Sequence, residues 1–149
     1  MEAIIFVGIQ GAGKSTFFHD RFFDTHVRIN LDMLRTRRRE ELLLAACLQA
    51  RQPFVIDNTN PLPIDRRRYI EPARAAGFRT VAYFFKTSLR DAMQRNNLRT
   101  GKQKVPVPAV AAAFKRLLAP SREEGFDDIF VVELTGDRGF LVTQDASEV

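Results

Sequence analysis

The chain has 149 residues, of which 45% are hydrophobic, and its formal net charge is +5. This length and apolar fraction favour a globular chain over a disordered one and are enough for one domain with a core. We expect neither a membrane span nor a secretion signal, because no apolar run is long enough and Glu2 stands where a signal has basic residues. A single cysteine, Cys47, excludes an internal disulfide. We therefore expect a cytoplasmic protein.

Apolar and turn-forming residues predict strands and helices that alternate along the chain. The predicted strands are residues 4–7, 27–30, 54–57, 79–85 and 128–134. The predicted helices are residues 14–23, 31–49, 64–76, 89–98 and 110–118. Because such alternation is typical of a parallel sheet, we predict an α/β fold in three layers, with five parallel strands and helices on both faces. We interpret 1–149 as a single domain, and its tail, 135–149, is compatible with a short hairpin, an extra strand or partial disorder.

A glycine-rich segment, residues 8–15, joins the first predicted strand to the first predicted helix. It fits the pattern G-x-x-x-x-G-K-S/T, in which successive backbone N–H groups and the helix N-terminus point at phosphate oxygens. Lys14 supplies a positive charge for the β- and γ-phosphates, and the Ser15 hydroxyl can ligate Mg²⁺. The residues expected to contact the nucleotide are Gly8, Gly11, Ala12, Gly13, Lys14, Ser15 and Thr16. We therefore predict the P-loop fold of NTPases and kinases, with ATP and Mg²⁺ as cofactors.

A carboxylate and an arginine follow the second predicted strand, at the edge where ligands gather in open α/β sheets. Asp32 comes just after residues 27–30, and Arg35 is three residues further on, so both would lie on one face of a helix. One interpretation is that Asp32 accepts a proton from an acceptor hydroxyl while Arg35 holds an anionic group of the acceptor. The alternative makes Asp32 the N-cap of the helix and Arg35 an exposed charge.

A second polar cluster follows the third predicted strand. Asp57 comes after three apolar residues, as in a Walker B strand whose carboxylate reaches the Mg²⁺ shell or the acceptor. The three residues after it can hydrogen-bond a ligand from a rigid strand end, although an Asx-type turn before Pro61 is the alternative. The phosphate loop upstream favours the functional interpretation. The residues expected at the substrate from this cluster are Asp57, Thr59 and Asn60.

Two arginines, Arg95 and Arg99, are one helical turn apart and precede a break in the helical pattern at 100–104. Phosphoryl transfer builds charge on the equatorial phosphate oxygens, which arginines carried on a closing lid can neutralise. We predict such a lid at about 95–106, with Arg95 on the ATP side and Arg99 as a catalytic residue. A solvated basic helix end is the alternative.

Other charged runs are interpreted as solvated helix faces. Residues 37–41 and 66–68 belong to this group, although a nucleic-acid path is possible for both. The positive net charge suits an anionic partner such as nucleic acid, or simply a basic surface, and charge alone does not decide between them. We expect Cys47 to be buried on a helix and most of the thirteen phenylalanines to lie in the core.

Taken together, these clusters resemble the kinase domain of polynucleotide 5′-hydroxyl kinases, as found in phage and animal end-healing enzymes. The resemblance covers residues 3 to about 134. The segments that carry it are 55–61, 66–69, 73–77, 95–99 and 105–108. The chain has no D-x-D-G-T motif of the phosphatase domain that those enzymes also carry, and Leu31 stands where relatives often have a basic residue.

The resemblance implies a role for each matching position. Asp32 would be the general base that activates the acceptor hydroxyl, and Arg35 would bind the neighbouring phosphate of the acceptor. Arg99 would stabilise the transition state, with Arg95 assisting on the ATP side. The residues that the resemblance places in the acceptor pocket are Asp57 and Thr59.

Our leading hypothesis is a kinase that transfers the γ-phosphate of ATP to the 5′-hydroxyl of DNA or RNA, with nucleic acid ends as its partner. One alternative is a P-loop kinase for a small hydroxylated metabolite, with the same fold and the same role for Asp32. Another is a nucleotide-binding ATPase or switch. The presence of an acceptor base and an arginine pair disfavours the switch, because a switch needs neither.

Overall fold

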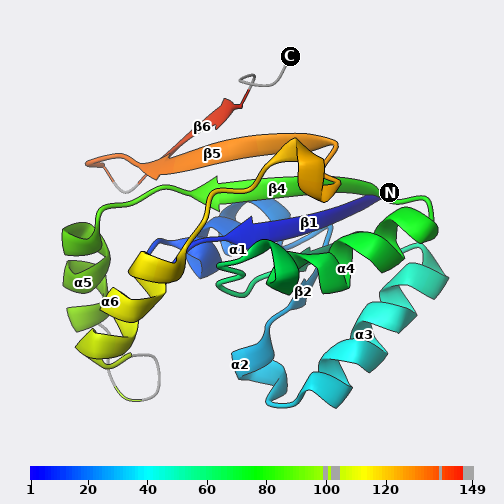
Figure 1. Cartoon of the computed structure of the whole chain (residues 1–149), viewed down its shortest axis with the longest axis horizontal. Helices are drawn as coiled ribbons and strands as arrows, with labels where there is room; N and C mark the ends of the chain where they lie inside the picture. Colours follow the sequence, from blue (N-terminus) through cyan, green and yellow to red (C-terminus); the bar gives the residue numbers. More distant parts are fainter. Residues whose placement is uncertain (99–100, 102–104, 138, 146–149) are drawn as a thin grey trace.

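The structure is a computed structural model that describes residues 1–98, 101, 105–137 and 139–145. Among these residues, six strands form one sheet in the order β2-β3-β1-β4-β5-β6 (Figure 1). The strands are β1 (Glu2–Val7), β2 (Val27–Ile29), β3 (Phe54–Ile56), β4 (Arg79–Phe85), β5 (Asp128–Leu134) and β6 (Phe140–Gln144). No described helix is both long and apolar enough to cross a membrane.

Strands β1 to β5 are parallel, as predicted, and β6 adds a sixth strand that runs antiparallel to β5. The predicted parallel arrangement of the first five strands is therefore confirmed. Strand β6 falls in the tail for which a hairpin or an extra strand was among the expectations. Its Phe140 ring packs edge-on against Phe17 of the first helix, with 5.0 Å between ring centroids. This apolar contact helps to hold the strand on the sheet.

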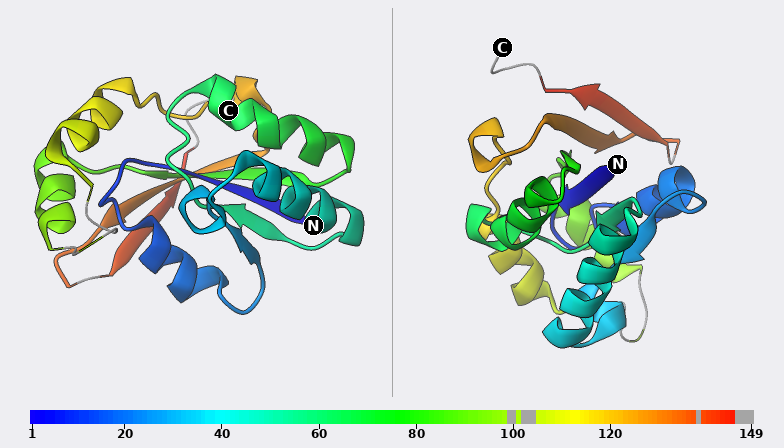
Figure 2. Two further views of the ribbon diagram at one scale, coloured as in Figure 1. Left: turned by 90° about the horizontal axis from the view of Figure 1, so that it is seen from below. Right: turned by 90° about the vertical axis from the view of Figure 1, so that its right-hand side faces the viewer.

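Helices cover both faces of the sheet (Figure 2). They are α1 (Lys14–Phe22), α2 (Leu31–Leu34), α3 (Arg37–Ala50), α4 (Pro63–Ala75), α5 (Leu89–Asn97) and α6 (Val107–Arg116), with a 3₁₀ turn η2 (Arg122–Glu124). Both faces need covering because the apolar side chains of the central strand β1 alternate between two cores. Ile5 packs with α3 and α4 on one face, whereas Ile4 and Phe6 pack with the phenylalanines of α1 on the other.

A third, smaller cluster holds α5 and α6 at the carboxyl end of the strands. It consists of Ile9 from the loop after β1, Ala92 from α5 and Val110 from α6, all fully buried. The two helices therefore lie against the phosphate loop. Helix α6 begins at Val107, three residues before the predicted start, because prolines are compatible with the first turn of a helix.

The single helix predicted over residues 31–49 is in fact two helices. Helix α2 ends at Leu34, and its C-cap residue, Arg35, has a positive φ of 75°. Thr36 then caps α3, and its hydroxyl accepts a hydrogen bond from the Arg39 N–H at 3.2 Å. The apolar spacing spans the break, but a threonine N-cap competes with a continuous helix and wins here.

Two residues that were interpreted as solvated are buried. Glu40 is 1% exposed, and Arg66 has no exposed surface. The guanidinium of Arg66 pairs with Glu124 of η2 at 2.8 Å and donates to the carbonyl oxygen of Asn60 at 2.9 Å. A charge run predicts exposure only where no distant partner is available, and η2 supplies one. Cys47 is buried on a helix, as expected.

We expect Arg66→Ala to lower the free energy of unfolding by about 3–5 kcal/mol, because it leaves the carboxylate of Glu124 without its buried partner. Denaturant unfolding followed by circular dichroism measures this. Arg67→Ala is the matched control, because its side chain is 64% exposed, and it should change stability by no more than about 0.5 kcal/mol. Equal effects of the two substitutions would contradict this account.

Candidate active site

The phosphate loop, residues 8–15, connects the buried strand β1 to helix α1. Gly11 and Gly13 have φ angles of 81° and 94°, which L side chains rarely adopt. A Cβ atom at Gly11 would also overlap the carbonyl oxygen of Ala92 in α5. Both the backbone conformation and the approach of a neighbouring helix therefore require glycine at this position.

The ammonium group of Lys14 is held inside the loop. Its Nζ donates to the carbonyl oxygens of Gly8 and Ile9, at 2.8 Å in each case. The first N–H groups of α1 have no partner within the helix, and they add to the positive potential on the same side. This arrangement of N–H groups around an ammonium fits the phosphate chain of ATP.

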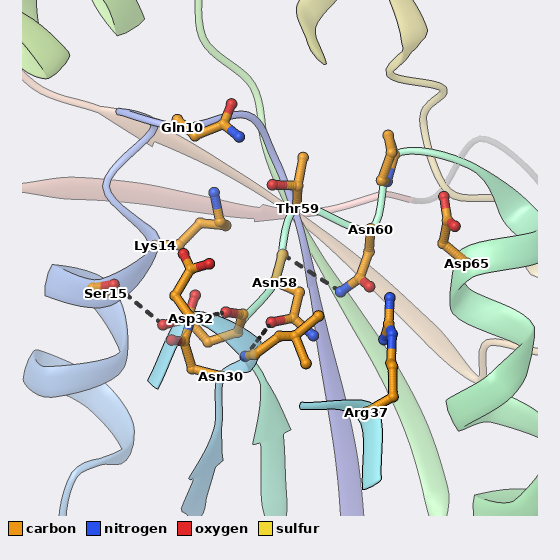
Figure 3. Close-up of a pocket in the computed structure, with 13 residues that line it drawn as sticks. Gln10, Lys14, Ser15, Asn30, Asp32, Arg37, Asn58, Thr59, Asn60 and Asp65 are labelled. Atoms are coloured by element: carbon orange, nitrogen blue, oxygen red, sulfur yellow. Dashed lines mark hydrogen bonds between the residues drawn. The ribbon is translucent and has the colours of Figure 1, made fainter. Parts of the chain in front are cut away.

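A cavity of about 290 Å³ opens beside the loop at the carboxyl ends of the strands (Figure 3). Its walls come from the loop, from α2, and from the turn that links β3 to α4. The lining residues are Gln10, Lys14, Ser15, Asn30, Leu31, Asp32, Arg37, Asp57, Asn58, Thr59, Asn60, Pro61 and Asp65. The cavity therefore brings together six of the predicted site residues, namely Lys14, Ser15, Asp32, Asp57, Thr59 and Asn60.

Ser15, Asp57 and Arg28 form a hydrogen-bonded triangle at one side of this cavity. The Ser15 hydroxyl donates to Oδ2 of Asp57 at 3.2 Å, and Nε of Arg28 donates to the same oxygen at 2.8 Å. Nη2 of Arg28 also donates to the Ser15 hydroxyl at 3.1 Å. A hydroxyl and a carboxylate are hard oxygen donors of the kind that Mg²⁺ prefers, so Ser15 and Asp57 fit the predicted metal.

Helix α2 begins at the cavity and is tied to the turn after β3. Asn30 caps the helix by accepting from the Met33 N–H, and its amide donates to the carbonyl oxygen of Asp57 at 2.6 Å. The N–H of Leu31 donates to Oδ1 of Asn58 at 2.8 Å. The alternative interpretation of Asp32 as the N-cap is therefore wrong. Asp32 instead lies in the first turn of α2 and lines the cavity.

A buried polar network lies behind the cavity wall. The carboxylate of Glu40 accepts from the Tyr69 hydroxyl at 3.0 Å and from Nδ2 of Asn58 at 3.0 Å. It also accepts from Nη1 of Arg37 at 2.8 Å. Burial of the phenol, together with the nearby Glu40 carboxylate, raises the pKa of Tyr69 to about 12, so the hydroxyl stays a donor at neutral pH. The network fixes Arg37 at the cavity wall.

The backbone turn that carries Thr59 and Asn60 is bonded to β1. The carbonyl oxygen of Thr59 accepts from the Gly8 N–H at 3.1 Å. The Asn60 amide donates to the carbonyl oxygen of Phe6 at 2.8 Å and is 5% exposed. Asn60 therefore helps to build the site, whereas the Thr59 side chain is turned towards the cavity (Figure 3).

Two predicted arginines, Arg35 and Arg95, do not line this cavity. Arg35 caps the C-terminus of α2 and is not part of the cavity lining, where Arg37 stands instead. Arg95 lines a second cavity of about 740 Å³ between α5 and the turn after β5. Its Nη1 would lie 3.2 Å from a Cβ at Gly13, so this arginine reaches the phosphate loop. Arg99 and four further residues of the predicted lid lie outside the described residues, although Asn96 accepts from the Val105 N–H at 2.8 Å across the lid's two ends.

Arg28, Arg37 and Glu40 are site residues that the sequence interpretation missed. Arg28 is the polar residue of a three-residue strand, Val-Arg-Ile, that ends beside the phosphate loop. An arginine two residues before the end of the predicted strand, 27–30, was the available signal for it. No local pattern distinguishes Arg37 and Glu40 from their charged neighbours, because the partners that they share with the site, Tyr69 and Asn58, are far away in the sequence.

The chain matches a family model described as an AAA domain over residues 4–123. The chain belongs to this AAA domain family. A protein of Acanthamoeba polyphaga mimivirus with the name of a bifunctional polynucleotide phosphatase/kinase is 31% identical over 147 residues, which cover 94% of this chain and 35% of that protein. The bifunctional polynucleotide phosphatase/kinase of Schizosaccharomyces pombe is 26% identical over 132 residues, which cover 86% of this chain and 32% of that protein.

The chain therefore spans about a third of the length of the curated relatives that it matches. Among solved structures, it resembles a gluconokinase from Sinorhizobium meliloti 1021, with a TM-score of 0.61 and 20% identity over 89% of this chain and 82% of the other. At that identity the likeness shows the fold alone, and the fold is that of P-loop kinases. The family, the relatives and the fold together identify a P-loop kinase domain.

We expect Gly11→Ala to destabilise the domain more than Gly77→Ala, by about 1–3 kcal/mol, because only the first adds an overlap with α5. Gly77 is the matched control, since its φ of 79° is equally left-handed and nothing lies within 4 Å of its Cβ position. Thermal and denaturant unfolding measure the difference. If both substitutions cost the same, the approach of Ala92 to the loop is not tight.

Proposed function

We propose that this domain transfers the γ-phosphate of ATP to the 5′-hydroxyl end of a DNA or RNA strand. The observation that carries the proposal is that Asp32 and the phosphate loop line one cavity. The acceptor class comes from the names of the two relatives, which pair a phosphatase with a kinase. The matched segment contains the phosphate loop, and this favours the kinase half of those names. A reaction that uses ATP suits a cytoplasmic location.

On the nucleotide side, the phosphates of ATP would lie along residues 8–16, with Lys14 beside the β- and γ-phosphates. Ser15 and Asp57 would hold Mg²⁺, which supplies positive charge against the phosphate oxygens. The nucleoside would lie in the second cavity, beside Arg95. In this arrangement Asp57 serves the metal side of the site, one of the two roles that its position after the strand allows, rather than the acceptor pocket that the resemblance implies.

On the acceptor side, the 5′-hydroxyl would lie against the Asp32 carboxylate, which takes its proton as the oxygen attacks the γ-phosphate in line. Thr59 would contact the acceptor from the opposite wall. Arg35 would bind the neighbouring phosphate of the strand, and Arg37 is fixed nearby to share that charge. Arg99 would stabilise the transition state, with Arg95 assisting.

We expect Asp32→Asn to lower the transfer rate by about 10² to 10⁴ while ATP binding is retained, because only the proton acceptor is lost. The assay is transfer of labelled γ-phosphate from ATP with Mg²⁺ to a 5′-hydroxyl oligonucleotide. A 5′-phosphorylated oligonucleotide is the substrate control. Asp20→Asn is the protein control, because this exposed carboxylate lies on α1 away from the cavity.

Normal transfer by the Asp32→Asn protein would overturn the role of this residue. If the unsubstituted protein binds ATP but labels no oligonucleotide, the acceptor class is wrong, and a small hydroxylated metabolite takes its place. Steep weakening of oligonucleotide binding with rising salt would support a polyanionic acceptor, because each bound phosphate releases counterions.

A further inference from the structure

Arg28 contacts both of the side chains that would hold Mg²⁺. Its guanidinium contacts the Asp57 carboxylate through Nε at 2.8 Å and the Ser15 hydroxyl through Nη2 at 3.1 Å. These two oxygen atoms are the ones that fit Mg²⁺. The position that a divalent cation needs is therefore engaged by a cation of the protein itself.

The buried state of Asp57 explains why a cation is there. The carboxylate is 1% exposed, and a buried charge is costly unless it is paired. Arg28 neutralises it, and Mg²⁺ bound at the same oxygen would do so equally. Both cations cannot occupy that position together, because at contact distances two positive charges repel strongly in a partly buried site.

The fold gives Arg28 room to leave. It lies on β2, which is the edge strand of the sheet, and its side chain is 29% exposed. The guanidinium can therefore move towards solvent without disturbing the core. Asp57 has no such freedom, because the turn that carries it is bonded to neighbouring elements on both sides.

We propose that Arg28 is a competing cation built into the nucleotide site, which Mg²⁺ must displace from Ser15 and Asp57. In the absence of nucleotide it neutralises Asp57. When Mg²⁺·ATP binds, the guanidinium loses its contacts with the Ser15 hydroxyl and the Asp57 carboxylate. The free energy of replacing these contacts with Mg²⁺ sets the Mg²⁺ concentration that the domain requires. This inference rests on the proposed role of Ser15 and Asp57 as the metal side of the site.

The test is the Mg²⁺ dependence of ADP binding to the full chain, measured by isothermal titration calorimetry. The quantity compared is the ratio of the ADP dissociation constants without and with Mg²⁺. Arg28→Gln should raise this ratio at least about tenfold, because removing the competing charge favours the metal. Arg21→Gln is the charge-matched control, since it lies on the same helix as Ser15 but contacts the ring of Phe17 instead.

Thermal unfolding, measured without ligands and with Mg²⁺·ADP, gives a second readout that does not depend on phosphate transfer. Without metal, Arg28→Gln should melt at a lower temperature than the unsubstituted protein, because Asp57 loses its counter-ion, and Mg²⁺·ADP should raise its melting temperature by more. If Arg28→Gln fails to fold, the double substitution Arg28→Gln with Asp57→Asn replaces it. That protein should fold, and it should bind ADP with the same Mg²⁺ dependence as Asp57→Asn alone.

An unchanged or smaller ratio in Arg28→Gln would overturn the inference, because Arg28 would then not compete with the metal. If the unsubstituted protein still transfers phosphate in that case, only this inference fails and the proposed function stands. If Ser15→Ala leaves the Mg²⁺ dependence of ADP binding unchanged, the metal assignment itself fails, and the role of Arg28 fails with it.

Discussion

The hydrogen bonds of one turn, residues 57–61, fix the positions of the parts of the site relative to one another. Its backbone and side chains bond to the phosphate loop through Gly8, to β1 through Phe6 and to the start of α2 through Asn30. Arg66 of α4 stabilises the turn by donating to two of its carbonyl oxygens. Asp57 and Asn60 of this turn are buried, and their side chains are hydrogen-bonded to other parts of the protein. The spacing between the loop and Asp32 depends on these bonds.

The features that the sequence predicted well are those that short segments specify. The phosphate loop depends on glycines and a lysine at fixed spacing, and the strands of the sheet depend on apolar runs such as residues 54–56 that are buried on both faces. The sixth strand was harder to predict, because residues 135–145 have little apolar content and are held largely by pairing with β5 and by the contact of Phe140 with Phe17.

The features that the sequence could not specify depend on partners distant in the chain. Glu40 looks like any charge on an amphipathic helix until Tyr69 and Asn58 are placed beside it. Arg66 likewise needs Glu124, 58 residues away. The break at Arg35 has a local cause, the Thr36 cap, but a continuous apolar pattern outweighs a single capping residue when a sequence is interpreted alone. Pairing of this kind becomes visible only when the fold is known.

The tight contact between Gly11 and the carbonyl oxygen of Ala92 has a geometric consequence for catalysis. Helix α5 carries Arg95 one turn beyond Ala92, so the depth at which α5 rests on the loop also sets how closely a guanidinium can approach the phosphates. A side chain at Gly11 would push the helix outward by about the radius of a methyl group. The lack of a Cβ atom at Gly11 thus sets the distance between the loop and α5. This distance determines how far the Arg95 guanidinium extends over the phosphate site.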